Sequence, residues 1–159
     1  MTKQFKSASR RAVATIAALA AVPAVVLAHH SFSLYNNEVT KVFTGVVTRD
    51  AHHLQIFFAP MNADRTNVER GPDGKPVIWA VEMAGSAQAA TQGISVNNFP
   101  AGTIFSTAMH PLRSGELAGA REGNLFKCPA KKPPAAGKHC DSVEGSTKHG
   151  EGALAAAKP

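Results

Sequence analysis

The sequence predicts a mainly β protein, a small five-stranded barrel with one short helix between the third and fourth strands. Two observations predict this class. Short segments rich in β-branched and aromatic residues recur along the chain after residue 38. A single alanine-rich segment separates the third of them from the fourth, and no long helical pattern appears in this part of the chain.

Composition and alternation predict five strands. The first, residues 39–48, contains Gly45, which we expect to form a bend or bulge. In the third, residues 77–83, alternation places Trp79 on one face and Glu82 on the other. The other predicted strands are residues 54–58, 103–110 and 117–127.

The helix is predicted at residues 85–93, GSAQAATQG, where alanine and glutamine replace β-branched residues between Ser86 near the N-cap and Gly93 at the end. The resulting order is that of an oligonucleotide-binding-type (OB) barrel, a Greek-key barrel of five strands. A β-sandwich is the alternative, but the sequence offers too few strands for one. The fold class alone predicts no function, because OB barrels bind many unrelated ligands.

Residues 1–28 have the pattern of a cleaved export signal. Four basic residues and no acid precede an apolar run, and Ala28 completes a small-residue cleavage site. The run is too short and too rich in alanine to anchor well in a bilayer core about 30 Å thick. The sequence therefore predicts a periplasmic protein whose mature chain begins at His29. Cleavage after Ala24 is the alternative, and Arg10-Arg11 leaves the twin-arginine route open beside the general one.

Removal of the signal changes the charge of the chain. Four of the 17 Lys and Arg residues lie in the signal, so the mature chain has 13 basic residues against 11 acidic ones. Six of the eight remaining lysines lie between residues 127 and 158, in the proline-rich end of the chain, so nucleic acid is not an expected partner. The 131 residues of the mature chain suffice for one domain, which we place at residues 29–127.

The two cysteines bound the proline-rich segment, residues 128–140. In an exported protein we expect a disulfide between Cys128 and Cys140, worth about 3 kcal/mol in the chain-entropy model. A zinc site that adds His139 is the less favoured alternative, because the spacing matches no common zinc finger. Residues 141–159 are small and polar, which predicts a disordered tail in which His149, like His139, is solvated.

Four short motifs follow one another along residues 28–127. They are the mature start HHSF, the strand EVTKVFTGVV, Trp-x-x-Glu at residues 79–82, and His110-Pro111 at the end of a later strand. In this order they resemble a family of small exported proteins of Gram-negative bacteria that is known only as a domain of unknown function. That family opens its second strand with Trp-x-Asn-Pro-His, where this chain has Arg-Asp-Ala-His, so only His52 matches. The resemblance implies no activity.

The histidines are the candidate metal ligands. Cleavage before His29 would give one residue a free α-amine and an imidazole, and with His30 this nitrogen set suits Cu(II) and resembles the histidine brace of copper proteins. His52 and His110 stand at strand ends as further ligands, and Glu82 could orient a histidine. The alternatives are ordinary: a frayed terminus, a histidine bonded to a turn carbonyl and an exposed glutamate.

The sequence therefore predicts one of two functions. The first is a periplasmic protein that binds copper or another divalent metal, which requires residues 29–37 to fold back near His52 or His110. The second is a metal-free barrel that binds a small ligand or another envelope protein. We predict no catalytic residues, because no nucleophile motif, phosphate loop or carboxylate pair is evident. An oxidative copper enzyme ranks below both functions.

Overall fold

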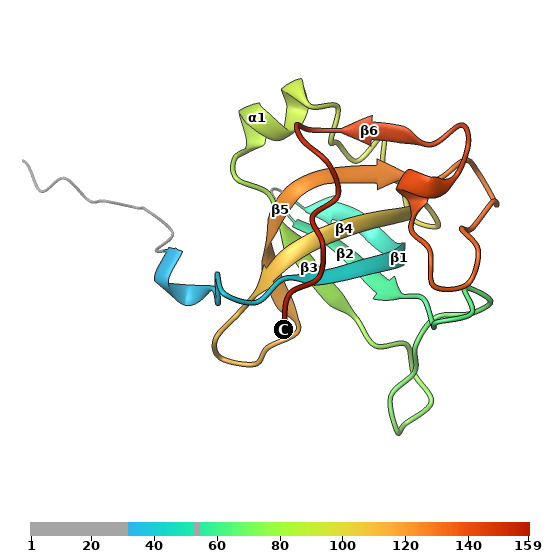
Figure 1. The fold of residues 1–159 in the computed structure, drawn as a ribbon, viewed down its shortest axis with the longest axis horizontal. Helices are drawn as coiled ribbons and strands as arrows, with labels where there is room; N and C mark the ends of the chain where they lie inside the picture. Colours follow the sequence, from blue (N-terminus) through green and yellow to red (C-terminus); the bar gives the residue numbers. More distant parts are fainter. Residues whose placement is uncertain (1–31, 53–54) are drawn as a thin grey trace, which may run out of the picture. The chain divides into compact units, whose positions relative to one another are not determined.

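The computed structural model describes residues 32–52 and 55–159 (Figure 1). The order of elements is the predicted one: three strands, a short helix and two strands, with a sixth, short strand near the C-terminus. The strands are β1 (Lys41–His52), β2 (Gln55–Pro60), β3 (Trp79–Glu82), β4 (Ile104–Pro111), β5 (Ala118–Lys127) and β6 (Thr147–His149). The helices are α1 (Ser86–Thr91) and the short 3-10 turns η1 (Phe32–Leu34) and η2 (Cys140–Ser142).

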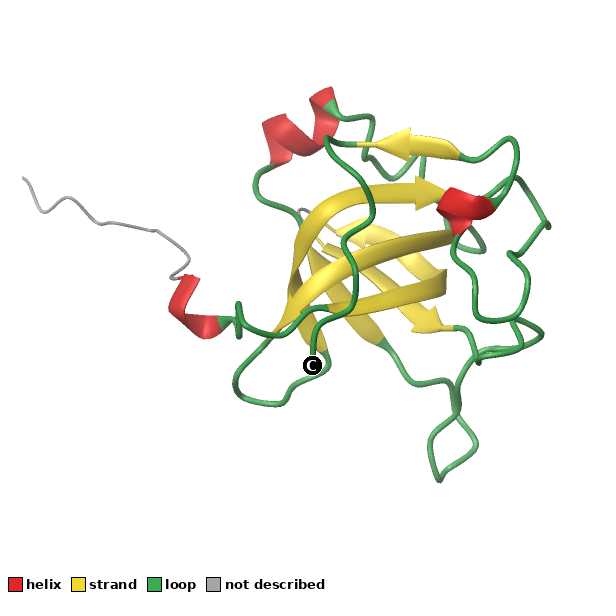
Figure 2. Ribbon diagram, in the orientation of Figure 1, coloured by secondary structure: helices red, strands yellow, loops and turns green. Residues whose placement is uncertain are grey.

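Strands β1 to β5 close into a barrel. Their order in the sheet is β3-β2-β1-β4-β5, and β5 pairs back onto β3 in parallel while the other pairs are antiparallel. Figure 2 shows the strands curving around a common interior. These pairings confirm the OB-type barrel that the sequence predicts. Among the described residues, no helix has the length and apolar character needed to cross a bilayer.

The barrel interior is filled by aromatic and aliphatic side chains. The rings of Phe58 and Phe105 meet edge to face with centroids 5.3 Å apart, and Phe99, from the loop after α1, packs on Phe105 at 6.0 Å. Alternation in β3 places Trp79 and Val81 in this core, as predicted. The core is therefore built by the side chains that the strand pattern assigns to one face.

Gly45 lies where β1 changes partners. It pairs with Pro60 of β2 on one side and with Phe105 of β4 on the other. A Cβ at this position would overlap the ring of Phe58. The glycine therefore lets the strand bend over a packed ring, in the place where the sequence predicts a bend.

The chain after Cys140 differs from the prediction of a disordered tail. Strand β6 pairs with the second half of β5, and Lys158 exchanges backbone hydrogen bonds of 3.0 and 3.2 Å with Thr40 at the start of β1. Because β3 pairs only with residues 118–120 of β5, this edge of the strand is open beyond them, and β6 pairs with its last three residues, 125–127. Backbone pairing of this kind needs few large side chains, which is why composition did not reveal it.

Candidate functional site

The barrel residues predicted as ligands lie along one row of the strand register. His52 pairs with Gln55, and Gln55 pairs with Glu82. Ala120 of β5 pairs with Glu82 on one side and with His110 on the other. Paired residues on neighbouring strands project to the same face, so Glu82 and His110 share the outer face of the barrel. Their Cα atoms stand two strand spacings apart, on the order of 10 Å.

His110 is held in one orientation at the end of β4. Its Nδ1 lies 2.9 Å from the carbonyl oxygen of Val39. A carbonyl only accepts, so Nδ1 carries a proton and donates it. The other nitrogen, Nε2, faces Oε2 of Glu122 at 3.6 Å, and the hydroxyl of Thr40 donates to the same oxygen at 2.8 Å. The His110 and Glu122 side chains are 20% and 27% exposed, so solutes can reach them.

The segment before β1 lies along the end of β4. The backbone N–H of Asn36 donates to the carbonyl of Pro111 at 2.8 Å. The buried Tyr35 donates its hydroxyl to Oε2 of Glu82 at 2.6 Å. Burial first, then this hydrogen bond and the charge of Glu82, raise the pKa of Tyr35 to about 12. The tyrosine therefore remains a donor at physiological pH and holds the segment on the barrel.

The described residues contain part of the predicted ligand set. His29 and His30 lie outside them, and His52 is placed only by its backbone register. Within residues 32–52 and 55–159, no three His, Cys, Asp or Glu side chains gather into a metal-holding group. The structure gives Glu82 a tyrosine partner, and its predicted role in orienting a histidine stays a prediction. The structure adds Glu122, which faces His110 and was missing from the sequence prediction.

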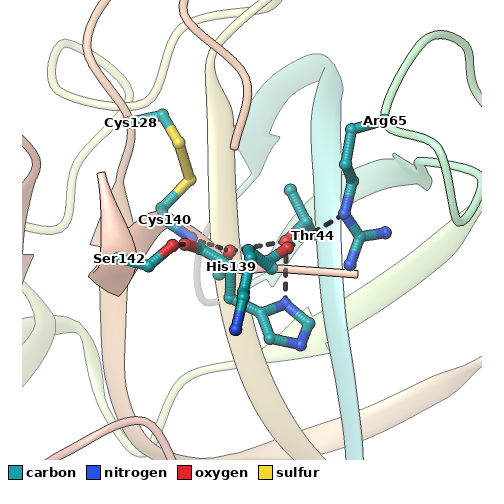
Figure 3. The surroundings of a disulfide bond; sticks show 8 residues. Thr44, Arg65, Cys128, His139, Cys140 and Ser142 are labelled. Carbon is teal, nitrogen blue, oxygen red and sulfur yellow. Dashed lines mark hydrogen bonds between the residues drawn. A yellow bond between two sulfur atoms is a disulfide. The ribbon is translucent and has the colours of Figure 1, made fainter. Parts of the chain in front are cut away.

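A chain of hydroxyl groups links the disulfide to the barrel (Figure 3). The predicted bond between Cys128 and Cys140 is present, and the N–H of Cys140 donates to Oγ of Ser106 at 2.8 Å. The hydroxyls of Ser106 and Thr44 lie 2.7 Å apart, and Thr44 Oγ1 lies 2.9 Å from Nδ1 of His139. Ser106 is fully buried, and its hydroxyl and that of Thr44 connect the backbone of Cys140 to the ring of His139.

The two late histidines are packed against the barrel, which corrects the prediction that they are solvated. Burial and then the nearby cation of Arg65 lower the pKa of His139, and Asp141 opposes this shift. His149 places its ring edge against Phe99, 4.9 Å between centroids, with Nδ1 3.3 Å from the carbonyl of Gln92. Burial also lowers the pKa of His149, against backbone hydrogen bonds near Gln92 that raise it.

We expect the folded protein to lose stability as the pH falls below about 6.5, the pKa of histidine in an unfolded chain. Because the folded-state pKa of each late histidine is lowered, the unfolded chain binds more protons in this window. The stability contributed by His139 and His149 is complete above the unfolded pKa and is lost as the pH falls through the lower folded values. The amide of His139→Asn can still form a hydrogen bond with Thr44 but does not titrate, so this variant should flatten the dependence of the urea midpoint on pH. Identical slopes for both proteins would contradict this account.

A shallow groove of about 420 Å³ lies on the outer face of β1, β2 and β3. Its only charged lining residue among those described is Arg49, whose guanidinium carbon lies 3.6 Å from the ring centroid of Phe57. Ile78 and Leu117 add side chains that are 40% and 46% exposed. The groove is also lined by Thr48, Trp79 and Ala80. Its chemistry suits an apolar ligand with an acidic group.

Comparison with known proteins assigns a family but no activity. Neither the curated proteins nor the solved structures contain a match to this chain. Residues 16–121 match the model of a family of unknown function (DUF6152). This match covers two thirds of the chain and includes His29, His30, His52, Glu82 and His110, but it stops before Glu122 and both cysteines. The chain therefore belongs to this family of unknown function.

Proposed function

We propose that the protein is exported to the periplasm and binds a divalent metal ion, copper foremost, through His29, His30 and His110. The α-amine and imidazole of a mature N-terminal His29 form a chelate, and the two other imidazoles extend a nitrogen-rich ligand set. Binding requires the amine to lose its proton, which its reference pKa near 8 permits at neutral pH. His52 is a further candidate ligand.

The position of the segment that follows the terminal histidines supports this proposal. A terminal metal site needs this segment to return to the barrel near a barrel histidine. Asn36 is bonded to Pro111, the residue directly after His110, and Val39 accepts a hydrogen bond from His110 itself. Tyr35 adds its bond to Glu82. These contacts place residues 35–39 beside His110, which supports the proposal from the described part of the segment.

Metal titration of two N-terminal forms tests the proposal. Protein that begins at His29 should bind Cu(II) with one-to-one stoichiometry in calorimetry, with nitrogen ligands in its electron paramagnetic resonance spectrum. A form with glycine before His29 converts the chelating amine into an amide. Loss of a residue that only hydrogen-bonds a metal ligand lowers metal affinity by up to about 100-fold. Loss of the chelating amine itself should therefore lower the affinity by more than about 100-fold. Equal affinities for the two forms would contradict the proposal.

His110→Asn separates a metal ligand from a structural histidine. The amide of asparagine can keep the hydrogen bond to the carbonyl of Val39, but it has no counterpart of Nε2. We expect the Cu(II) affinity of this variant to fall on the order of 10-fold or more, with little change in thermal stability. His149→Asn, which alters a histidine on β6, is the matched control and should bind like the parent protein. An unchanged affinity in His110→Asn would remove His110 from the site.

The groove supports a second candidate function, metal-free binding of a small ligand or an envelope protein. Its volume of about 420 Å³ falls within the range of about 300–1,000 Å³ typical of small-molecule sites. This function predicts that protein purified from the periplasm carries no stoichiometric metal in elemental analysis. It also predicts that Arg49→Ala abolishes binding of the ligand or partner protein. The metal proposal predicts instead that the purified protein carries one metal ion and that Arg49→Ala leaves metal binding unchanged.

A further inference from the structure

We infer that Glu122 is a carboxylate ligand of this metal site, so that the barrel contributes a two-residue half-site made of His110 and Glu122. The inference deepens the proposed function and rests on it for the remaining ligands. It adds an anionic oxygen to a set that the sequence predicts to contain nitrogen alone. Such a mixed set suits first-row divalent ions that accept both imidazole and carboxylate, such as Cu(II) and Zn(II).

The separation of the two side chains is close to the spacing of two ligands that share one ion. Nε2 of His110 and Oε2 of Glu122 are 3.6 Å apart, which is too far for a hydrogen bond. Two atoms that each bind one ion at about 2.0 to 2.1 Å lie about 3 Å apart at a right angle and about 3.4 Å apart in a tetrahedron. Nε2 and Oε2 would need to approach each other by only about 0.2 to 0.6 Å to reach this spacing.

Each side chain of the half-site is oriented by a second partner. Histidine ligands in metal sites commonly donate their other ring N–H to a carbonyl or carboxylate, and the carbonyl of Val39 has this role for His110. The hydroxyl of Thr40 holds Glu122 in the same manner. Val39 and Thr40 are adjacent residues at the end of the docked N-terminal segment. Docking of that segment and orientation of both ligands therefore occur together.

The charge of Glu122 is available to a cation. Its side-chain contacts among the described residues are with His110 and Thr40, and no Lys or Arg in that part of the chain forms an ion pair with it. Both side chains are partly exposed on the outer face, so an ion can enter without opening the core. With Nδ1 protonated and donating to Val39, a neutral His110 turns the lone pair of Nε2 toward Glu122, so both facing atoms are able to bind a cation.

Glu122→Gln tests the inference with a side chain of nearly the same shape. The amide oxygen can still accept from Thr40, but the negative charge is lost. In protein that begins at His29, we expect the Cu(II) affinity to fall by about 10- to 100-fold. Glu116→Gln, which removes the charge of an exposed glutamate in the loop between β4 and β5, is the control and should bind like the parent. Circular dichroism confirms that each variant is folded.

The outcomes separate the inference from the proposed function. If the parent binds tightly and Glu122→Gln binds equally well, the inference is wrong and the proposed function stands. If the parent does not bind Cu(II) tightly, the proposed function fails. The half-site is then tested by nuclear magnetic resonance on the protein with glycine before His29, which lacks the chelating amine. Selective broadening of the His110 ring by trace Cu(II), lost in Glu122→Gln, would support the half-site. Absence of that broadening would overturn it.

Discussion

Replacing Gly119 by alanine should destabilise the barrel by about 3 kcal/mol, the upper end of the usual cost of overpacking. A Cβ on Gly119 would overlap the carbonyl of His110 and lie 2.9 Å from Sδ of Met109. Methionine can shift, but the carbonyl belongs to β4 and can move only if the pairing of β4 with β5 opens. The substitution should therefore also displace His110 and, with it, weaken the metal binding that we propose.

Urea unfolding of two glycine variants checks this result. Gly85→Ala is the matched control, because a Cβ there meets no atom within 4 Å and the backbone of Gly85 is extended, with φ at −179°. The control should unfold within about 0.5 kcal/mol of the parent, as surface substitutions usually do. Equal unfolding free energies for Gly119→Ala and Gly85→Ala would show that β5 does not approach β4 as closely as described.

Replacing both cysteines by serine should lower the free energy of unfolding by about 3 kcal/mol, since the closed loop restricts the unfolded chain. The sequence separation of Cys128 and Cys140 is 12 residues. The effect extends to the folded state, because the Cys140 N–H and the adjacent His139 join Ser106 and Thr44 through the hydroxyl chain. The barrel has its own core, so its strand signal in circular dichroism should persist while segment 128–140 becomes more mobile.

Hydrogen exchange and unfolding together measure that change. The amide of Cys140 or its serine replacement should exchange faster in the double variant, while amides in β1 and β2 keep their protection. The double variant is preferable to a single one, because a single substitution leaves a reactive thiol. An unchanged free energy of unfolding, or equal loss of protection throughout the barrel, would contradict the role given to the disulfide.

Much of the barrel was predictable because local signals agree with the final fold. Gly45, the alternation around Trp79 and the alanine-rich helix each favour the structure that forms, and their order selects the OB topology. Strand ends were less predictable: β3 is Trp79–Glu82, whereas alternation extends over residues 77–83. The last segment was mispredicted because β6 is held by the free edge of β5, which depends on where β3 stops.

The candidate site was predictable only in part, because its contacts join distant residues. His110 was singled out by its place at a strand end. Glu122 was missed because the register between β4 and β5 shifts between Thr107 and Ala108, and no local pattern reveals this shift. The bond from Tyr35 to Glu82 joins residues 47 positions apart and could be found only from the fold.

Native mass spectrometry of the protein recovered from the envelope of exporting cells tests the central claim most directly. The account predicts a chain that starts at His29, is two hydrogens lighter because of the disulfide, and carries one divalent metal ion. Mild acid should release the ion, since protons compete for the amine and imidazole ligands. A mature chain that starts elsewhere, or one that starts at His29 and takes up no metal when Cu(II) is supplied, would contradict it.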